Sequence, residues 1–234
     1  MLEDWLPWAR GPAFVCCFGF MCLGYLGLVA LTIADVRRHL RRAGDKHLPV
    51  RAIVVATLKW LFPLGKIRQQ LLFSVTSIVF HIAILLVPLL LLGHIALWAR
   101  GIGLSWPGIP NELADILTVT AVVTAVALVL QRVGSRATRS LSRFSDYVIP
   151  LLVALPFASG FLVMHPGWSP FSFDSTLFLH VMSANLLLVL MPTTKLSHAA
   201  LIPAVQLVSE VGWHWPVDSG SKVAAALGKE GEPV

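Results

Sequence analysis

Apolar residues dominate this chain in five long runs, separated by stretches in which polar and charged residues gather. The runs cover about residues 12–34, 71–98, 113–130, 147–164 and 176–198. Each approaches or exceeds the roughly 20 residues that a helix needs to cross about 30 Å of hydrocarbon. The runs are continuous rather than alternating, and only helices or closed barrels satisfy every backbone group inside a bilayer. The pattern therefore predicts an all-α integral membrane bundle of five transmembrane helices.

The composition supports this class of protein. Of the 234 residues, 56% are hydrophobic and 13% are charged, whereas a soluble domain carries about 25% charged residues. A soluble enzyme, a disordered chain and a fibrous protein are excluded, because too little polar surface exists to cover a globule of this size. We expect one membrane domain over residues 1–216 and a flexible cytoplasmic tail, rich in Gly, Lys and Glu, over residues 217–234.

The basic residues predict the orientation. Residues 37–68 hold nine Lys and Arg, residues 132–143 hold four, and Lys195, Lys222 and Lys229 lie at or beyond the inner end of the fifth run, whereas Arg10 and Arg100 alone lie on the other side. The positive-inside rule then places the N-terminus outside and the C-terminus in the cytoplasm, in the cytoplasmic (inner) membrane. The net charge of +6 reflects this orientation, so we expect membrane lipid and no nucleic acid as a partner. Residues 52–70 are too short and interrupted to cross, and we interpret them as an interfacial segment or a docking surface for a soluble partner.

Charged residues are nearly absent inside the five runs. Burying one costs at least about 2.5–3.5 kcal/mol, so those present usually mark ion or proton paths. Their absence argues against a pump, an ion-coupled transporter or a voltage sensor. Four histidines remain inside: His81 and His94 on the second run, and His180 and His198 on the fifth. A neutral imidazole in hydrocarbon needs a partner for its lone pair, and haem iron readily takes two axial imidazoles.

Depth in the membrane predicts how these histidines pair. The second helix enters from the cytoplasm and the fifth from outside, so His94 lies opposite His180, and His81 opposite His198. Each pair would clamp one haem b. His180 and His198, 18 residues apart, share a helix face. His81 and His94, 13 residues apart, lie about 140° apart on a straight helix, a phase that a kink at Pro88 would change. The alternative is four histidines that hydrogen-bond from helix to helix without a cofactor.

At these residues the sequence resembles the gamma, or cytochrome b, subunit of respiratory nitrate reductases. It also resembles the related membrane cytochrome b subunits of sulfite-reductase-linked and heterodisulfide-reductase-type complexes. The resemblance covers nearly the whole chain, and its most specific pieces are FHI at 80–82, GH at 93–94, LH at 179–180 and PTTKLSH at 192–198. The 18-residue gap matches the family, whereas the 13-residue gap is longer than the nitrate reductase pattern by about one turn. We therefore expect a relative rather than a nitrate reductase subunit itself.

The resemblance implies two haem b groups and the residues that hold them. His94 and His180 would hold the haem distal to the soluble partner. His81 and His198 would hold the proximal haem. Gly93 would let haem or a quinone approach the backbone, in a quinone site beside the outer haem. A lysine that assists this site in nitrate reductase has no clear counterpart here, and the nearest basic candidates are Arg100 and His165.

Other polar residues near the span ends have ordinary explanations beside functional ones. Asp115 and Glu112, at the outer start of the third run, fit the helix dipole but would also serve near a quinone. His165 fits an interfacial residue, yet a histidine could also exchange a proton with a quinone. Haem propionates would find cations in Arg100 outside and in Arg37, Arg38 and Lys195 inside, although snorkelling explains all four. Three histidines flank the inner ends and are assigned no role: His39, His47 and His214.

These expectations combine into a di-haem b membrane subunit of a respiratory oxidoreductase complex. It would carry electrons between the quinone pool, menaquinone or ubiquinone, and an iron–sulfur subunit on the cytoplasmic side. The chain carries no iron–sulfur or molybdenum motif, so terminal catalysis would belong to a catalytic subunit of the complex. Two alternatives remain: a haem-free membrane anchor or assembly subunit of a redox complex, and a transporter, which the charge-free spans disfavour.

Overall fold

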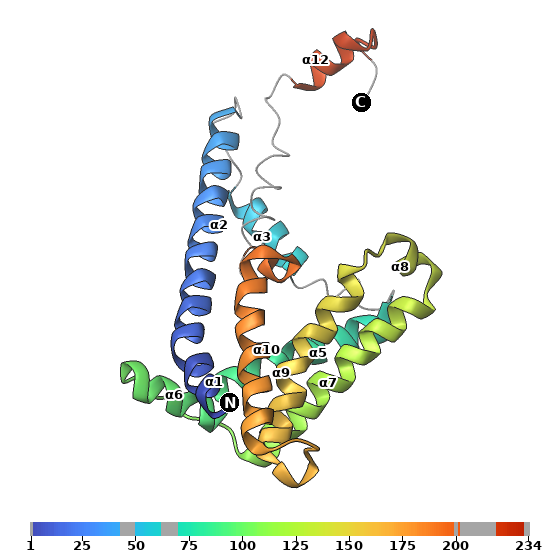
Figure 1. Ribbon diagram of the computed structural model, residues 1–234. Helices are drawn as coiled ribbons and strands as arrows, with labels where there is room; N and C mark the ends of the chain where they lie inside the picture. The colour runs from blue at the N-terminus through green and yellow to red at the C-terminus, as the bar shows by residue number, and fades with distance from the viewer. Residues whose placement is uncertain (1, 43–49, 62–69, 199–200, 202–218, 232–234) are drawn as a thin grey trace. The chain divides into compact units, whose positions relative to one another are not determined.

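The structure is a computed structural model that describes residues 2–42, 50–61, 70–198, 201 and 219–231 (Figure 1). Five of its helices are long and apolar enough to cross a membrane: Trp5–Arg38, Leu71–Leu90, Asn111–Gly134, Ser145–Met164 and Phe173–Thr193. The predicted all-α fold with five membrane-spanning helices is therefore confirmed, and the protein is a multi-pass membrane protein. The side on which each terminus lies stays a prediction.

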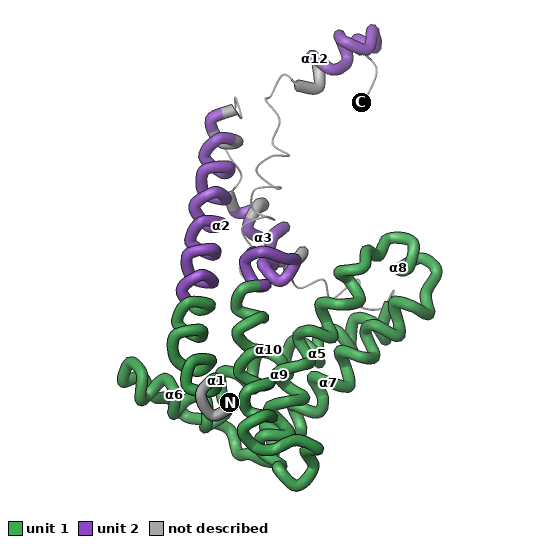
Figure 2. Tube along the Cα trace, in the orientation of Figure 1, with its two compact units in different colours: residues 1–18, 66–189 green, residues 19–65, 190–234 purple. Residues whose placement is uncertain are grey.

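The chain divides into two compact units, drawn in different colours in Figure 2. Unit 1 comprises Met1–Phe18 and Lys66–Val189, and unit 2 comprises Gly19–Gly65 and Leu190–Val234. Unit 1 contains the elements that carry most of the predicted site, namely α5 (Leu71–Leu90), α6 (Leu92–Ile102), α7 (Asn111–Gly134), α8 (Arg136–Leu141), α9 (Ser145–Met164) and most of α10 (Phe173–Thr193).

Helix α7 packs between α5 and α9 and forms the core of unit 1 (Figure 1). Its buried positions recur every three or four residues and are mostly small, in the order Ala114, Thr118, Ala121, Ala125 and Leu128. Small side chains let neighbouring helices approach closely, which is how helices associate where no water drives them together. The faces of α5 and α7 that point away from this core are apolar and exposed, as at Leu72 on α5, 72% exposed, and Ile116 on α7, 63% exposed. Such faces suit contact with lipid tails.

The second predicted span, 71–98, is divided in the structure. Helix α5 ends at Leu90, Leu91 takes an extended conformation with φ −67° and ψ 124°, and α6 begins at Leu92. The sequence predicted a kink at Pro88, and the helix instead stops just after that residue. Pro88 lacks the N–H that would bond back to Ile84, which weakens the ladder at this point. His94 therefore lies on a separate short helix, and the straight-helix phase between His81 and His94 does not apply.

The end of α5 is closed by groups from the chain that follows it. The last four carbonyls of a helix have no partner inside the helix. Here each accepts a hydrogen bond: Val87 from Leu91 N at 3.0 Å, Pro88 from His94 Nδ1 at 3.2 Å, Leu89 from Trp106 Nε1 at 2.7 Å and Leu90 from Ile109 N at 3.0 Å. One of the predicted haem ligands is thus also part of a helix cap.

Gly108 makes this closure sterically feasible. A Cβ atom at this position would lie 2.5 Å from Leu92 Cδ2 and 2.8 Å from the Leu90 carbonyl oxygen. Real Cβ atoms essentially never come so close. The loop before α7 can approach the end of α5 because residue 108 has no side chain.

Unit 2 contains most of α2 (Phe14–Arg42), α3 (Val50–Leu61), the 3₁₀ turn η4 (Lys195–Ser197) and α12 (Ser219–Ala226). Within it, α2 and the end of α10 approach closely, since a Cβ at Gly24 would lie 2.6 Å from Pro192 Cβ. The segment expected to be a flexible tail holds helix α12. Part of the interfacial segment 52–70 is helix α3, and residues 62–69 lie outside the described residues, as do Lys46, Lys66, Arg68, His47 and His214.

Candidate functional site

The two histidines predicted as the outer pair lie close together in unit 1. The ring centroids of His94, on α6, and His180, on α10, are 6.1 Å apart, and the ring planes differ by 10°. Two imidazoles on opposite sides of one metal ion have centroids about 6 Å apart, because each metal–nitrogen bond is about 2 Å long. The separation suits two axial ligands and also an offset ring pair. The hydrogen bonds of the two rings favour the ligand role.

In both rings Nδ1 donates a hydrogen bond to a backbone carbonyl. His94 Nδ1 lies 3.2 Å from the Pro88 oxygen, and His180 Nδ1 lies 2.9 Å from the Pro156 oxygen. A carbonyl only accepts, so each Nδ1 carries a proton, and in the neutral imidazole Nε2 then keeps its lone pair. Within the described part of the chain neither Nε2 has a hydrogen-bond partner. Histidines that bind metals typically donate their second N–H in this way, which fixes the tautomer and the ring direction.

Helix α9 forms a cradle for the His180 ring. A Cβ added at Gly160 would lie 3.0 Å from His180 Cε1 and 3.1 Å from Nδ1. Pro156, four residues earlier on the same face of α9, supplies the carbonyl that accepts from Nδ1. The His180 ring is therefore held by a hydrogen bond, and it occupies the space that a side chain at position 160 would need. A pair of neutral imidazoles with unused lone pairs, one of them cradled in this way, is a donor set that fits haem iron.

The residues of the predicted inner pair belong to different units, His81 to unit 1 and His198 to unit 2. His81 is exposed on α5, its ring lies edge-on to Phe80 with centroids 5.5 Å apart, and its Nδ1 donates to the Ser77 carbonyl at 2.7 Å. His198 is exposed just after η4, and its Nδ1 donates to the Lys195 carbonyl. Because a carbonyl only accepts, each of these bonds places a proton on Nδ1. Their pairing around a second haem stays a prediction.

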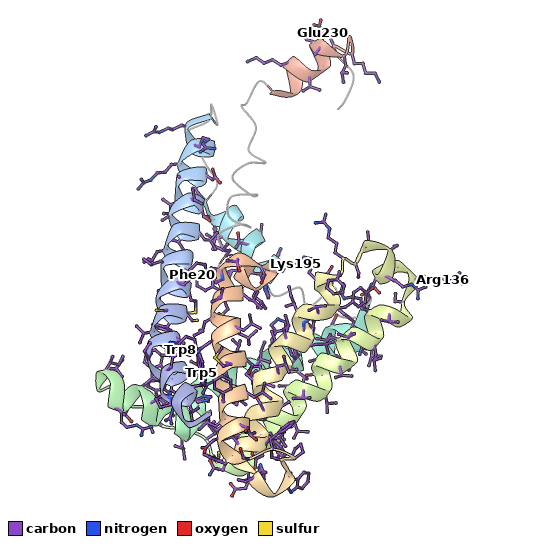
Figure 3. All side chains as sticks on the ribbon, in the orientation of Figure 1. Trp5, Trp8, Phe20, Arg136, Lys195 and Glu230 are labelled. Atoms are coloured by element: carbon purple, nitrogen blue, oxygen red, sulfur yellow. The ribbon has the colours of Figure 1, made fainter. Side chains whose placement is uncertain are left out.

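The remaining predicted residues lie at exposed positions. Gly93 is next to His94 on α6, and a Cβ there would meet open space, so the backbone on this side is accessible. Arg100 is exposed on α6, and its Nε donates to the Ala96 carbonyl of its own helix at 3.2 Å. Lys195 is exposed in the turn that follows α10 (Figure 3). Their contacts with propionates or a quinone stay predictions.

His165 has a partner that the sequence did not indicate. Its Nε2 lies 3.3 Å from Oδ2 of Asp115, which joins the end of α9 to the start of α7. Its Nδ1 donates to the Phe161 carbonyl at 3.0 Å, and the two rings stack with centroids 4.3 Å apart. The two residues were separate candidates in the sequence, and the structure brings them together.

Four residues that position the histidines were missed by sequence reasoning: Pro156, Gly160, Trp106 and Gly108. Predicted depth in the membrane, which paired the histidines, could also have placed Gly160 near His180. It lies near the outer end of the fourth run, opposite the outer start of the fifth, where His180 lies. The roles of Trp106 and Gly108 depend on the break at Leu91, which no periodicity in the second run announced.

Comparison with known proteins places the chain in a family without assigning its chemistry. No protein-family model matches the chain, and no solved structure matches it. A protein of Nitratidesulfovibrio vulgaris strain Hildenborough is 38% identical over 184 residues, which cover 75% of this chain and 80% of that protein. Identity at this level over most of both chains shows common descent. The chain belongs to the same protein family as this N. vulgaris protein.

Proposed function

We propose that the chain is the di-haem cytochrome b subunit of a respiratory oxidoreductase complex in the cytoplasmic membrane. The observation that carries the proposal is the His94–His180 pair, with ring centroids 6.1 Å apart and both Nε2 lone pairs unused. Haem supplies one-electron chemistry when bound, so the chain needs to contribute ligands and a path across the membrane. Nearly charge-free spans suit a subunit that moves electrons rather than ions.

Each set of residues has a part in this proposal. His94 and His180 hold the outer haem, and His81 and His198 hold the inner one. Arg100 lies near the outer site and Lys195 near the inner one, where each would bind propionates. Quinone exchange takes place at the outer end, near Gly93 and His165.

The soluble partners bind at the inner side. The basic segments that predict orientation gather there, and an iron–sulfur subunit with an acidic surface would dock on them. Several of these cations are exposed on regular helices, including Arg136 on α8 (Figure 3) and Arg37 and Arg41 on α2. A catalytic subunit bound beyond the iron–sulfur subunit would complete the reaction.

The test is the haem content of the purified full chain in detergent. We expect a b-type reduced-minus-oxidised spectrum and two haems per chain by the pyridine haemochromogen assay. His94→Ala and His180→Ala should each lose the same single haem, whereas His81→Ala and His198→Ala should each lose the other. His47→Ala, which changes a histidine outside the spans, is the matched control and should keep both. A flat difference spectrum of the wild-type chain overturns the proposal and leaves the haem-free anchor as the function.

A further inference from the structure

The His165–Asp115 pair joins two helices at the end where the sequence predicts the outer membrane face. Asp115 is one turn into α7, and His165 directly follows the last residue of α9. The two side chains are 33% and 32% exposed, so both are accessible without being fully hydrated. Neither residue makes another ion pair within the described part of the chain. Glu112, one turn before Asp115 on α7, is exposed and is the other acidic residue of this helix end.

The contacts of the pair favour one proton shared between its two facing atoms. His165 Nδ1 is committed, because the Phe161 carbonyl can only accept. Nε2 and the Asp115 carboxylate oxygen then face each other at 3.3 Å. If neither carried a proton, two lone pairs would repel. The pair is therefore stable either as imidazolium and carboxylate or as imidazole and carboxylic acid. When the proton leaves, the Nε2 lone pair and the carboxylate oxygen repel each other.

The surroundings of the pair suit a flat, apolar ring with polar edges. One face of the His165 ring is covered by Phe161. The Trp168 ring lies 6.4 Å from His165 and 6.0 Å from Phe161, centroid to centroid, and Trp168 is 75% exposed. Aromatic rings at a membrane interface combine an apolar body with a polar rim. A quinone headgroup has the same character.

The pair is also close to the predicted outer haem ligands along the fold. A Cβ added at Gly160 would lie 3.0 Å from the His180 ring, and His165 comes five residues later, directly after the end of α9. Five residues of α-helix rise about 7.5 Å. A headgroup beside His165 would therefore lie within about two helical turns of the His180 imidazole, measured along α9.

We propose that His165 and Asp115 together form the proton-exchanging group of a quinol site at this end of α7 and α9. This inference rests on the proposed function. Oxidation of one quinol to quinone breaks two O–H bonds and releases two protons and two electrons. The two electrons would be accepted by bound haem, which supplies one-electron chemistry. Each proton is taken up between His165 Nε2 and the Asp115 carboxylate when the pair is empty, and leaves from there to water on the exposed side. In the reverse direction the same pair supplies the protons.

The two residues have different parts in this exchange. His165 would contact the quinol hydroxyl, because its ring is partly exposed beside Trp168 and its Nε2 faces the Asp115 carboxylate. Asp115 is a positioning residue that stabilises the imidazolium form and directs Nε2. A pair with only a structural role would join α7 to α9 and leave quinol chemistry unaffected.

The experiment measures reduction of the haems in the full detergent-solubilised chain by a short-chain quinol, using stopped-flow absorbance. His165→Gln and Asp115→Asn should each slow this reduction by about 10²-fold or more, the usual range for losing general acid–base catalysis. Reduction by dithionite, which needs no proton acceptor at the site, should keep its wild-type extent in both variants. Asp115→Glu should recover most of the rate, and Asp174→Asn, an exposed carboxylate at the start of α10, is the matched control.

Two results would overturn the inference. The first is a wild-type rate of quinol-driven reduction in His165→Gln and Asp115→Asn with both haems present. The second is loss of haem from these variants, which would assign the pair a structural role. Failure of the proposed function is distinguishable, because it appears in the wild-type chain as the absence of haem before any variant is compared.

Discussion

The closest test of the site geometry is Gly160→Ala, which adds one methyl group against the His180 ring. The new Cβ would lie 3.0 Å from Cε1 and 3.1 Å from Nδ1, whereas non-bonded carbons rest about 3.5–4.0 Å apart. The ring must therefore move by roughly half an ångström, since α9 is a regular helix at this point. That movement strains the 2.9 Å hydrogen bond to Pro156, which is formed on the same helix.

The energy terms of this substitution oppose one another. Overpacking typically costs about 1–3 kcal/mol. Replacing glycine by alanine inside a helix returns about 1 kcal/mol. The net loss of unfolding free energy should be about 2 kcal/mol or less. Haem binding is more sensitive, because a ligand set must hold its geometry within about 0.5 Å. We therefore expect the outer haem to be lost, or its reduction potential to change, in a chain that remains folded.

The assay combines haem stoichiometry, a redox titration of the difference spectrum and a thermal melt. Gly27→Ala is the matched control, because Gly27 is also helical and its added Cβ meets nothing within 4 Å. This control should keep both haems and their potentials. The reasoning is refuted if Gly160→Ala also keeps two haems at wild-type potentials, because the cradle would then have no influence on the ligand.

Two further predictions concern the structure around the site. Gly108→Ala brings a Cβ to 2.5 Å from Leu92 Cδ2 and should reduce the free energy of unfolding by about 1–3 kcal/mol. We expect a lower melting temperature and weaker haem binding at His94, and an unchanged melting temperature would contradict the closure of α5. Asn185→Ala removes the buried 3.0 Å bond to the Ala9 carbonyl and should cost about 1–3 kcal/mol by the same melt, while Gly101→Ala, whose Cβ meets open space, should cost little.

Sequence patterns predicted the membrane-spanning helices well because length and hydropathy are local properties. The ends moved by a few residues, as at the fourth run, predicted over 147–164 and observed as Ser145–Met164. The interruption at Leu91 was predicted only as a kink at Pro88, because the groups that close the end of α5 are distant in sequence. Trp106 and Ile109 donate hydrogen bonds to carbonyls of α5 only once the loop between α6 and α7 has folded back against α5.

The candidate site was likewise predictable only in part. Depth in the membrane was enough to propose that His94 faces His180, since two antiparallel spans bring equal depths together. Helical phase alone does not say which backbone carbonyl a ring nitrogen reaches, so the roles of the Pro88 and Pro156 carbonyls were not foreseen. The His165–Asp115 pair was missed because each residue has an ordinary explanation when considered alone. Only the packing of α7 against α9 joins them.

The hydrogen bonds at the end of α5 bear on how the protein matures. All four terminal carbonyls are occupied by groups of the polypeptide, and the imidazole of His94 is one of these groups. The segment can thus settle during membrane insertion before any porphyrin arrives. Under the proposed function, a porphyrin added late would meet an imidazole already oriented by the Pro88 carbonyl, so biogenesis would require delivery of the cofactor but little rearrangement of the chain.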